Sequence, residues 1–315
     1  MPTLIAGWTL APTEEREGTM TTPSTPVTRK VDRVVDKVDL GPTMMSDSSS
    51  MIIAPGNNAW TDPFLLMGEE LVTQPGFDWH PHRGLETVTV ILDGALEHGD
   101  SMGNAGVIGP GDVQWMTAGR GIIHREVAAR SERAHILQLW INMPAGRKLA
   151  PTRYQDLRAG LQAVHTEPGV LVQVISGETA TVRGPALNHW PILGAMITLD
   201  PRTDYRQLLA GDERAFAYVV AGRLTIGGRP VRAGQVAWSD PVSRPGEPTT
   251  LALATGDGDQ QTRVMVFAGR PIGESVYASG PFVMNTREEI EQAYRDFHSG
   301  KFGSIPRHTR LPAGA

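Results

Sequence analysis

Short runs of alternating apolar and polar residues recur along most of the chain. Residues 87–92 (TVTVIL) lead into Asp93-Gly94, which is a strong hairpin signal. Similar runs follow the turn at residues 109–112 (GPGD) and occupy residues 122–126 and 135–142. Because turn signals recur about every 8–12 residues, the pattern predicts an all-β sandwich or barrel.

The same plan returns in the second half of the chain. Residues 216–220 and 223–226 form a second hairpin pattern, and residues 234–238 (GQVAW) echo residues 111–115 (GDVQW). A repeat at this distance indicates two structural units of one design. We therefore predict one barrel over residues 51–158 and a second over residues 159–315.

The first fifty residues have a different character, because they are polar, rich in Thr and Pro, and aperiodic. Such composition is typical of flexible segments. We expect a flexible arm over residues 1–50, in which residues 30–40 (KVDRVVDKVDL) form a first strand and residues 46–50 (SDSSS) a loop.

One helix is predicted near the C-terminus, over residues 286–299. Thr286 and Glu289 have the spacing of a capping box, and Gly300 supplies a stop. Ile290, Tyr294 and Phe297 share one face, so this helix is expected to pack on a barrel.

Composition narrows the chemistry. The 315 residues contain no cysteine, which excludes disulfides, thiolate metal sites and a cysteine nucleophile. Any metal must therefore be held by nitrogen and oxygen. The net charge of −5 gives no basic field for nucleic acid. Since no long apolar run and no basic leader are recognisable, we expect no membrane contact and a cytoplasmic protein.

Two pairs of potential ligands, one of two histidines and one of a histidine and a glutamate, suggest a metal site. His80 and His82 flank a proline, so on an extended segment both imidazoles point to one face. His124 and Glu126 repeat this spacing about forty residues later. If adjacent antiparallel strands carry the pairs, three imidazoles and a carboxylate converge, a donor set that suits Fe(II), Mn, Ni, Zn or Cu. The alternative for an isolated H-x-H is a turn or a surface pair.

Longer motifs extend this interpretation. His80, His82 and Glu86 match the H-x-H-x-x-x-E motif of the cupin superfamily. The chain resembles the pirin family more narrowly, from about residue 55 to residue 303. The resemblance is carried by residues 62–66 (DPFLL), 80–89 (HPHRGLETVT), 110–121 (PGDVQWMTAGRG), 135–144 (HILQLWINMP) and 280–286 (GPFVMNT).

Membership of that family would imply a bicupin, with a metal in the first barrel alone. The residues matching its ligands are His80, His82, His124 and Glu126, with Fe(II) foremost and Mn, Ni, Co, Cu or Zn as alternatives. Glu86 would then be a neighbour that orients a ligand, or an alternative ligand. In the second half, aligning its glycine hairpin on Gly94 places Leu208 and Ala210 opposite His80 and His82, so a second site is not expected.

Some pirins act as quercetin 2,3-dioxygenases, which cleave a flavonol with O₂. The resemblance thus implies a small flavonol-like substrate, with Glu126 as the base for its hydroxyl. Arg83, Trp79 and Met116 are candidates for the substrate pocket, with ion pairing or core packing as their alternatives. A different reading is a non-enzymatic metal- or redox-sensing protein that binds a regulatory or metabolic protein partner. No cluster of five or more basic residues marks a nuclear import signal.

Overall fold

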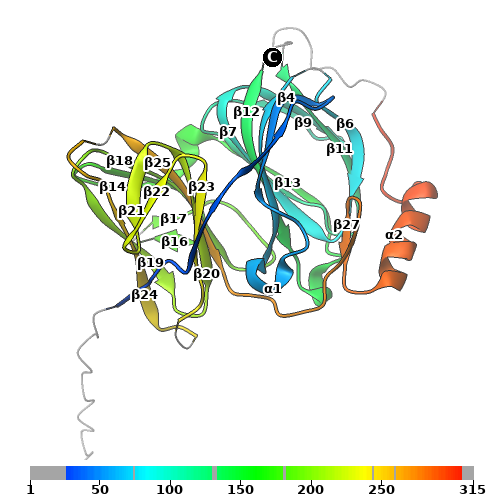
Figure 1. Ribbon diagram of the computed structural model, residues 1–315. Coiled ribbons are helices and arrows are strands. Elements are labelled where there is room, and N and C mark those ends of the chain that lie inside the picture. The colour runs from blue at the N-terminus through cyan, green and yellow to red at the C-terminus, as the bar shows by residue number, and fades with distance from the viewer. Residues whose placement is uncertain are drawn as a thin grey trace, which may run out of the picture.

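The computed structural model describes residues 26–306, apart from residues 74, 130–132, 180–181, 243–244 and 259. Two β-barrels lie side by side, as predicted from the alternating pattern (Figure 1). The expectation of an all-β fold with two barrels is confirmed. In the described part of the chain no helix has the length and apolar character needed to cross a membrane.

The first barrel is formed by two facing sheets. One has seven strands in the order β13-β10-β7-β12-β5-β4-β3, and the other has four in the order β6-β11-β8-β9. The short helix α1 (Asn58–Thr61) precedes β5. The strands are β3 (Val38–Gly41), β4 (Ser46–Ile53), β5 (Phe64–Val72), β6 (Phe77–His82), β7 (Leu85–Gly94), β8 (Leu96–Asp100), β9 (Ala105–Ile108), β10 (Val113–Thr117), β11 (Ile122–Ala128), β12 (Ala134–Asn142) and β13 (Arg153–Leu157).

The second barrel repeats this plan, with β14-β15-β18-β25-β20-β23-β2 facing a sheet built on β19, β24, β21 and β22. Strand for strand, β19 and β24 take the places of β6 and β11, and β18 takes that of β5. Its strands are β1 (Val27–Thr28), β2 (Arg33–Asp36), β14 (Ala163–Glu167), β15 (Val170–Ser176), β16 (Glu178–Thr179), β17 (Val182–Arg183), β18 (Ile192–Leu199), β19 (Asp204–Ala210), β20 (Arg214–Ala221), β21 (Arg223–Ile226), β22 (Arg229–Arg232), β23 (Gln235–Ser239), β24 (Pro248–Ala254) and β25 (Thr262–Gly269).

The N-terminal segment is more ordered than its composition suggests. Residues 27–28 and 33–36 pair with β24 and β23 of the second barrel, whereas residues 38–41 and 46–53 belong to the first. Arg29 is buried and bonded to the carbonyls of Ala210 and Glu213. The flexible arm predicted for residues 1–50 is therefore wrong from residue 27 onward, whereas the strand predicted within it at residues 30–40 is observed as β2 and β3. Residues 1–25 lie outside the described residues.

The loop predicted at residues 46–50 is also wrong, because these residues begin β4. Ser46 and Ser49 both donate hydrogen bonds to Glu70 on the neighbouring strand β5. A serine-rich run thus pairs as a strand because a long-range partner satisfies its hydroxyls.

An apolar layer joins the two barrels. It contains buried side chains of β7, β10 and β12, such as Val88, Trp115 and Leu139, together with Phe216 and Trp238 from the second barrel. The faces of β7, β10 and β12 that point away from the interior of the first barrel are therefore buried against the second barrel, and this burial accounts for their apolar side chains.

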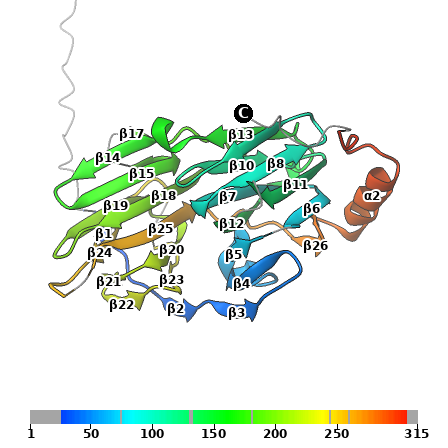
Figure 2. The same ribbon diagram turned by 90° about the horizontal axis from the view of Figure 1, so that it is seen from above.

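After β25 the chain returns to the first barrel. Here β26 (Tyr277–Ser279), β27 (Phe282–Met284) and α2 (Arg287–His298) lie beside β6 and β11, as Figures 1 and 2 show. We call residues 276–303 the C-terminal strap. The predicted capping box of the helix is present, since Thr286 accepts a hydrogen bond from the backbone of Glu289. The position of the helix in the sequence predicts that it belongs to the second barrel; in the structure it packs on the first barrel instead. Its cluster with the first barrel contains Ile123, Phe282, Met284, Ile290, Ala293 and Phe302.

Candidate metal centre

Several polar side chains point into the interior of the first barrel. Thr89 on β7 lies opposite Gln114 of β10 and Gln138 of β12, so the three share one face. That face looks into the barrel, because Thr89 bonds to Glu126 on the other sheet. The interior of the second barrel is instead lined largely by aliphatic side chains. The two barrels therefore differ in what they can bind.

Three imidazoles converge on this interior. Strands β6 and β11 are antiparallel, with His124 directly opposite His80 and Ile122 opposite His82. The ring centroids lie 4.4–5.0 Å apart, and the ligand nitrogens all lie within 4.8 Å of one another. Two nitrogens on one metal ion are at most about 4.2 Å apart, since each bond is about 2.1 Å long. Only a small inward adjustment separates this triad from a ligating one.

Hydrogen bonds fix two of the rings. His80 Nδ1 lies 2.7 Å from the carbonyl of Asp78, and His82 Nδ1 lies 3.3 Å from that of Pro281. Because a carbonyl only accepts, each Nδ1 carries the proton, and each Nε2 keeps its lone pair for a metal.

The charge state also suits a metal. Burial, together with the neighbouring His80, lowers the pKa of His82 to about 3. Burial, again with the neighbouring histidines, lowers the pKa of His124. Both rings are therefore neutral near neutral pH, which is the form that ligates metals.

His124 provides the test of fit. Its ring is fully buried, and neither nitrogen has a hydrogen-bond partner among the described residues. A buried polar atom left in this way costs about 1–3 kcal/mol, and a metal at Nε2 or Nδ1 would remove that cost. Imidazole nitrogens suit Fe, Zn, Cu or Ni, so the residues fit a bound metal. Within the described ranges, His80, His82 and His124 form the one convergent group of metal-ligating side chains.

Glu126 lies in the same interior but outside the triad's 4.8 Å group. Its carboxylate is buried and reaches across to the facing sheet. There it accepts a 2.9 Å hydrogen bond from the Thr89 hydroxyl and a 2.7 Å bond from the Gln138 amide. A bulge between His124 and Glu126 interrupts the pairing of β11 with β6 at this point.

Glu86 is not brought to the imidazoles. It lies opposite Thr117 on the face of β7 that turns toward the second barrel, and it accepts a 2.6 Å hydrogen bond from that hydroxyl. Burial raises its pKa, an effect opposed by Thr117, Trp115 and the backbone of His189 in the second barrel. Glu86 therefore lies at the interface between the two barrels.

The three candidate pocket residues divide between the two faces. Met116 faces the interior and packs in a cluster with Leu85 and Ile122. Trp79 lies on the outer face of β6, packed against the strap cluster. Arg83 also turns to the strap, where it pairs with Asp296 at 2.9 Å and lies over the Phe302 ring. Only Met116 is placed where a substrate in the barrel would touch it.

Trp140 and His98 are interior residues that the sequence analysis missed. The Trp140 ring lies edge-on to His82, with centroids 4.9 Å apart. The buried His98 ring lies 5.5 Å from His124 and stacks on Tyr154 at 4.4 Å. Period-two alternation from Gln138 would have placed Trp140 on the inner face.

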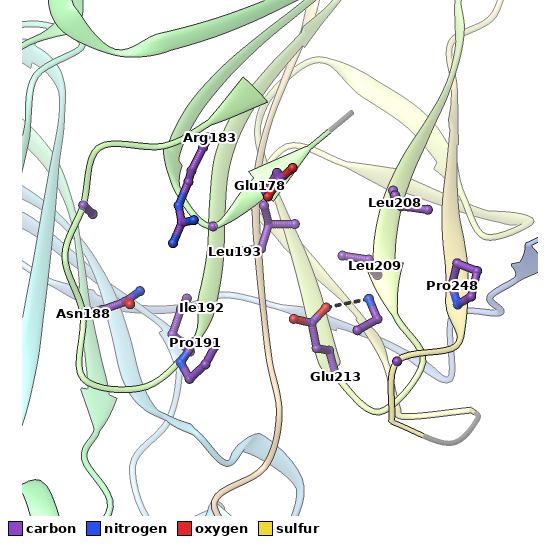
Figure 3. A pocket seen from close by; sticks show the side chains of 14 residues that line it. Glu178, Arg183, Asn188, Pro191, Ile192, Leu193, Leu208, Leu209, Glu213 and Pro248 are labelled. Atoms are coloured by element: carbon purple, nitrogen blue, oxygen red, sulfur yellow. Dashed lines mark hydrogen bonds between the residues drawn. The ribbon is translucent and has the colours of Figure 1, made fainter. Parts of the chain in front are cut away.

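The corresponding strand of the second barrel holds no ligands. Its inward side chains are Tyr205, Gln207 and Leu209, whereas Leu208 is 42% exposed. Leu208 therefore does not take the inward position that the predicted alignment with His80 gives it. A cavity of about 470 Å³ lies here between β18 and β19, lined in part by Leu193, Leu208 and Leu209 (Figure 3).

Comparisons with known proteins agree with this architecture. The family profile described as Pirin matches residues 43–141, and the one described as Pirin C-terminal cupin domain matches residues 194–303. Pirin from Homo sapiens is 39% identical over 244 residues, covering 77% of this chain and 83% of its own. A Pseudomonas aeruginosa protein provisionally named quercetin 2,3-dioxygenase is 39% identical over 258 residues, covering 76% and 86%. The crystal structure of a quercetin 2,3-dioxygenase from Acinetobacter baumannii superposes with a TM-score of 0.77 at 29% identity, covering 89% of this chain and all of that one.

Proposed function

The chain belongs to the pirin family of bicupins, and from this premise we propose that it is a metal-dependent dioxygenase that cleaves a flavonol, such as quercetin, with O₂. The convergence of three imidazoles inside a polar barrel carries the proposal, together with the burial that lowers the pKa of His82 and His124. The names of the Pseudomonas and Acinetobacter relatives support the choice of substrate class.

His80, His82 and His124 are the residues that would hold the metal. They project from the neighbouring strands β6 and β11. Fe(II) is our first choice, with Mn, Ni, Co, Cu or Zn as alternatives. When bound, the metal supplies Lewis acidity and a path for electrons between flavonol and O₂.

Glu126 is assigned the proton transfer. One of its carboxylate oxygens takes the proton of the flavonol hydroxyl, which leaves the substrate as an anion. Thr89 and Gln138 donate to the two oxygens and so hold the carboxylate in one orientation inside the barrel. Each oxygen keeps a second lone pair to receive the proton.

Glu126 is also our candidate for the fourth ligand. It follows His124 by two residues on β11, so it is the carboxylate nearest to the triad along that strand. To reach the metal, it would give up its bond with Thr89 or Gln138. The roles of ligand and base therefore compete for the same side chain.

The substrate would lie against the remaining inner surface. Met116 and Trp140 offer apolar contacts, whereas Thr87 presents a buried hydroxyl without a protein partner among the described residues. A flat, hydroxylated aromatic compound matches this combination of walls.

The test is turnover after anaerobic loading with each candidate metal. Quercetin loss with O₂ uptake and CO release is expected for at least one form. His124→Ala should lose both metal and turnover, whereas His165→Ala, which alters a second-barrel histidine paired with Glu167, should keep both. If every metal form binds one equivalent and leaves quercetin intact, the dioxygenase assignment is rejected in favour of a non-enzymatic role with a protein partner.

A further inference from the structure

We infer that the C-terminal strap, residues 276–303, is a positioning element of the metal centre, because it supplies the carbonyl that orients His82. This inference rests on the proposed metal site. It assigns a function in the first barrel to a segment that follows the second barrel in sequence.

The orientation of His82 depends on a distant part of the chain. Its Nδ1 lies 3.3 Å from the carbonyl of Pro281, which is 199 residues away in sequence. His80 is oriented locally instead, by the carbonyl of Asp78 two residues before it. Displacing the strap would thus release one ligand ring while leaving the other in place.

A buried lysine fixes the strap next to His82. Lys148 is only 2% exposed, and its ammonium group donates to the carbonyls of Gly84 and Val283 at 2.8 and 2.9 Å. Its third hydrogen bond goes to the Asn142 side chain at 2.6 Å. Gly84 and Val283 lie two residues beyond His82 and Pro281, so Lys148 ties together the two segments that carry the histidine and its acceptor.

The residue following His82 connects the site to helix α2. Arg83 donates to the Asp296 carboxylate at 2.9 Å, and its guanidinium lies 4.6 Å from the centre of the Phe302 ring. The carbonyl of Arg83 accepts a 3.0 Å bond from the backbone of Val283. Both sides of Arg83, main chain and side chain, are therefore bonded to the strap.

The second barrel offers a comparison, because a cavity lies at the place that the strap occupies in the first barrel. The gap between β18 and β19 is the cavity of about 470 Å³ in Figure 3. In the first barrel the corresponding place lies between the start of β5 and the end of β6. There Val283 of the strap packs with Leu65 and Ile122. The barrel that carries the imidazoles is thus the one whose gap is filled.

Asp296 and Lys148 are accordingly positioning residues that act through Arg83, Val283 and Pro281. They do not touch the metal. Backbone or carboxylate partners of a ligating histidine typically change metal affinity by about 10–100-fold when they are removed. We expect loss of strap docking to weaken metal binding within that range.

The first test is the affinity of the metal-free protein for Co(II), measured by competition with a chelator. The Asp296→Asn/Phe302→Ala variant should bind about tenfold more weakly or worse. The control, Glu291→Gln, removes an exposed ion pair on the same helix and should bind like the wild type. Asp296→Asn alone keeps the side-chain shape and serves if the double variant does not fold.

Equal affinity in variant and wild type would overturn the inference while leaving the proposed function intact. If the wild type itself binds no metal, the proposed function is rejected and the inference falls with it.

The second test separates positioning from general loosening. In the Co(II) protein, the Nδ1 protons of His80 and His82 give distinct paramagnetically shifted NMR signals. The His82 proton should exchange with solvent faster in the double variant, because its acceptor has moved, whereas the His80 proton should exchange at the wild-type rate. Unchanged exchange at His82, or equal acceleration at both rings, would overturn the inference.

Discussion

Acidifying the metal-free protein should destabilise it through His82. Burial holds the pKa of this ring at about 3, well below the ordinary histidine value of about 6.5. As the pH falls through about 6.5, the unfolded chain binds a proton there and the folded protein does not. The destabilisation is therefore absent above that pH and grows until the pH reaches about 3, where the folded ring is also protonated.

The size of the effect follows from the two pKa values. At about pH 5 the unfolded ring is about 1.5 pH units below its ordinary pKa, and each unit corresponds to about 1.4 kcal/mol. His82 alone should thus lower the free energy of unfolding by about 2 kcal/mol between about pH 7.5 and pH 5. The lowered pKa of His124 adds a contribution of the same sign.

Urea unfolding of the chelator-treated protein at both pH values measures this difference. His82→Gln cannot titrate, so its free energy of unfolding should lose about 2 kcal/mol of the wild-type pH dependence. His165→Gln alters a histidine of the second barrel that is paired with Glu167, and should retain the wild-type dependence. The same pH dependence in His82→Gln as in the wild type would refute the assignment of a buried, neutral ring.

Three further predictions concern residues around the site and the N-terminal segment. Gln138→Leu should lower quercetin turnover about tenfold at unchanged metal content, because Glu126 loses a hydrogen bond worth about 1–3 kcal/mol; unchanged turnover would contradict the role given to that bond. Glu86→Gln should retain a full equivalent of metal by mass spectrometry, because Glu86 faces the second barrel, and loss of metal would show that it acts at the triad. Arg29→Met should lower the free energy of unfolding by about 3 kcal/mol in urea, since it removes three hydrogen bonds of a buried guanidinium, each worth about 1 kcal/mol; a loss near zero would mean that the segment is dispensable.

The elements that the sequence predicts well are those with local signals. The strand expected at residues 87–92 is the centre of β7, since Asp93-Gly94 ends it within the hairpin itself. The helix expected at residues 286–299 is observed at Arg287–His298, because its capping box lies entirely within four consecutive residues. In both cases the determining interactions are between near neighbours in sequence.

Which face of a strand turns inward was harder to predict. Period-two alternation shows which residues share a face, but β7 is buried on both faces. Its inner face carries Thr87 and Thr89, and its outer face, with Glu86, packs toward the second barrel. Burial does not distinguish the two faces, and the expectation that Glu86 lies near the metal rests on the H-x-H-x-x-x-E motif rather than on the strand pattern.

Contacts between distant segments could not be predicted from spacing. Arg83 stands next to a ligand in sequence, yet its side chain pairs with Asp296, 213 residues later. Arg29 is bonded to Ala210 in the same long-range manner. The composition of the N-terminal segment, which contains Arg29, indicates a flexible arm. The place in the sequence of the C-terminal strap, which contains Asp296, indicates the second barrel. Both indications are wrong because neither composition nor chain order contains information on tertiary packing.

The most direct test of the account is the position of the metal in crystals of the protein loaded anaerobically with Fe(II). Diffraction data collected at the iron absorption edge should show one anomalous peak per chain. We predict that this peak lies within about 2.3 Å of Nε2 of both His80 and His82 and of one ring nitrogen of His124. A loaded protein whose peak lies elsewhere, or which shows none in the first barrel, would contradict the central claim that these three histidines form its metal centre.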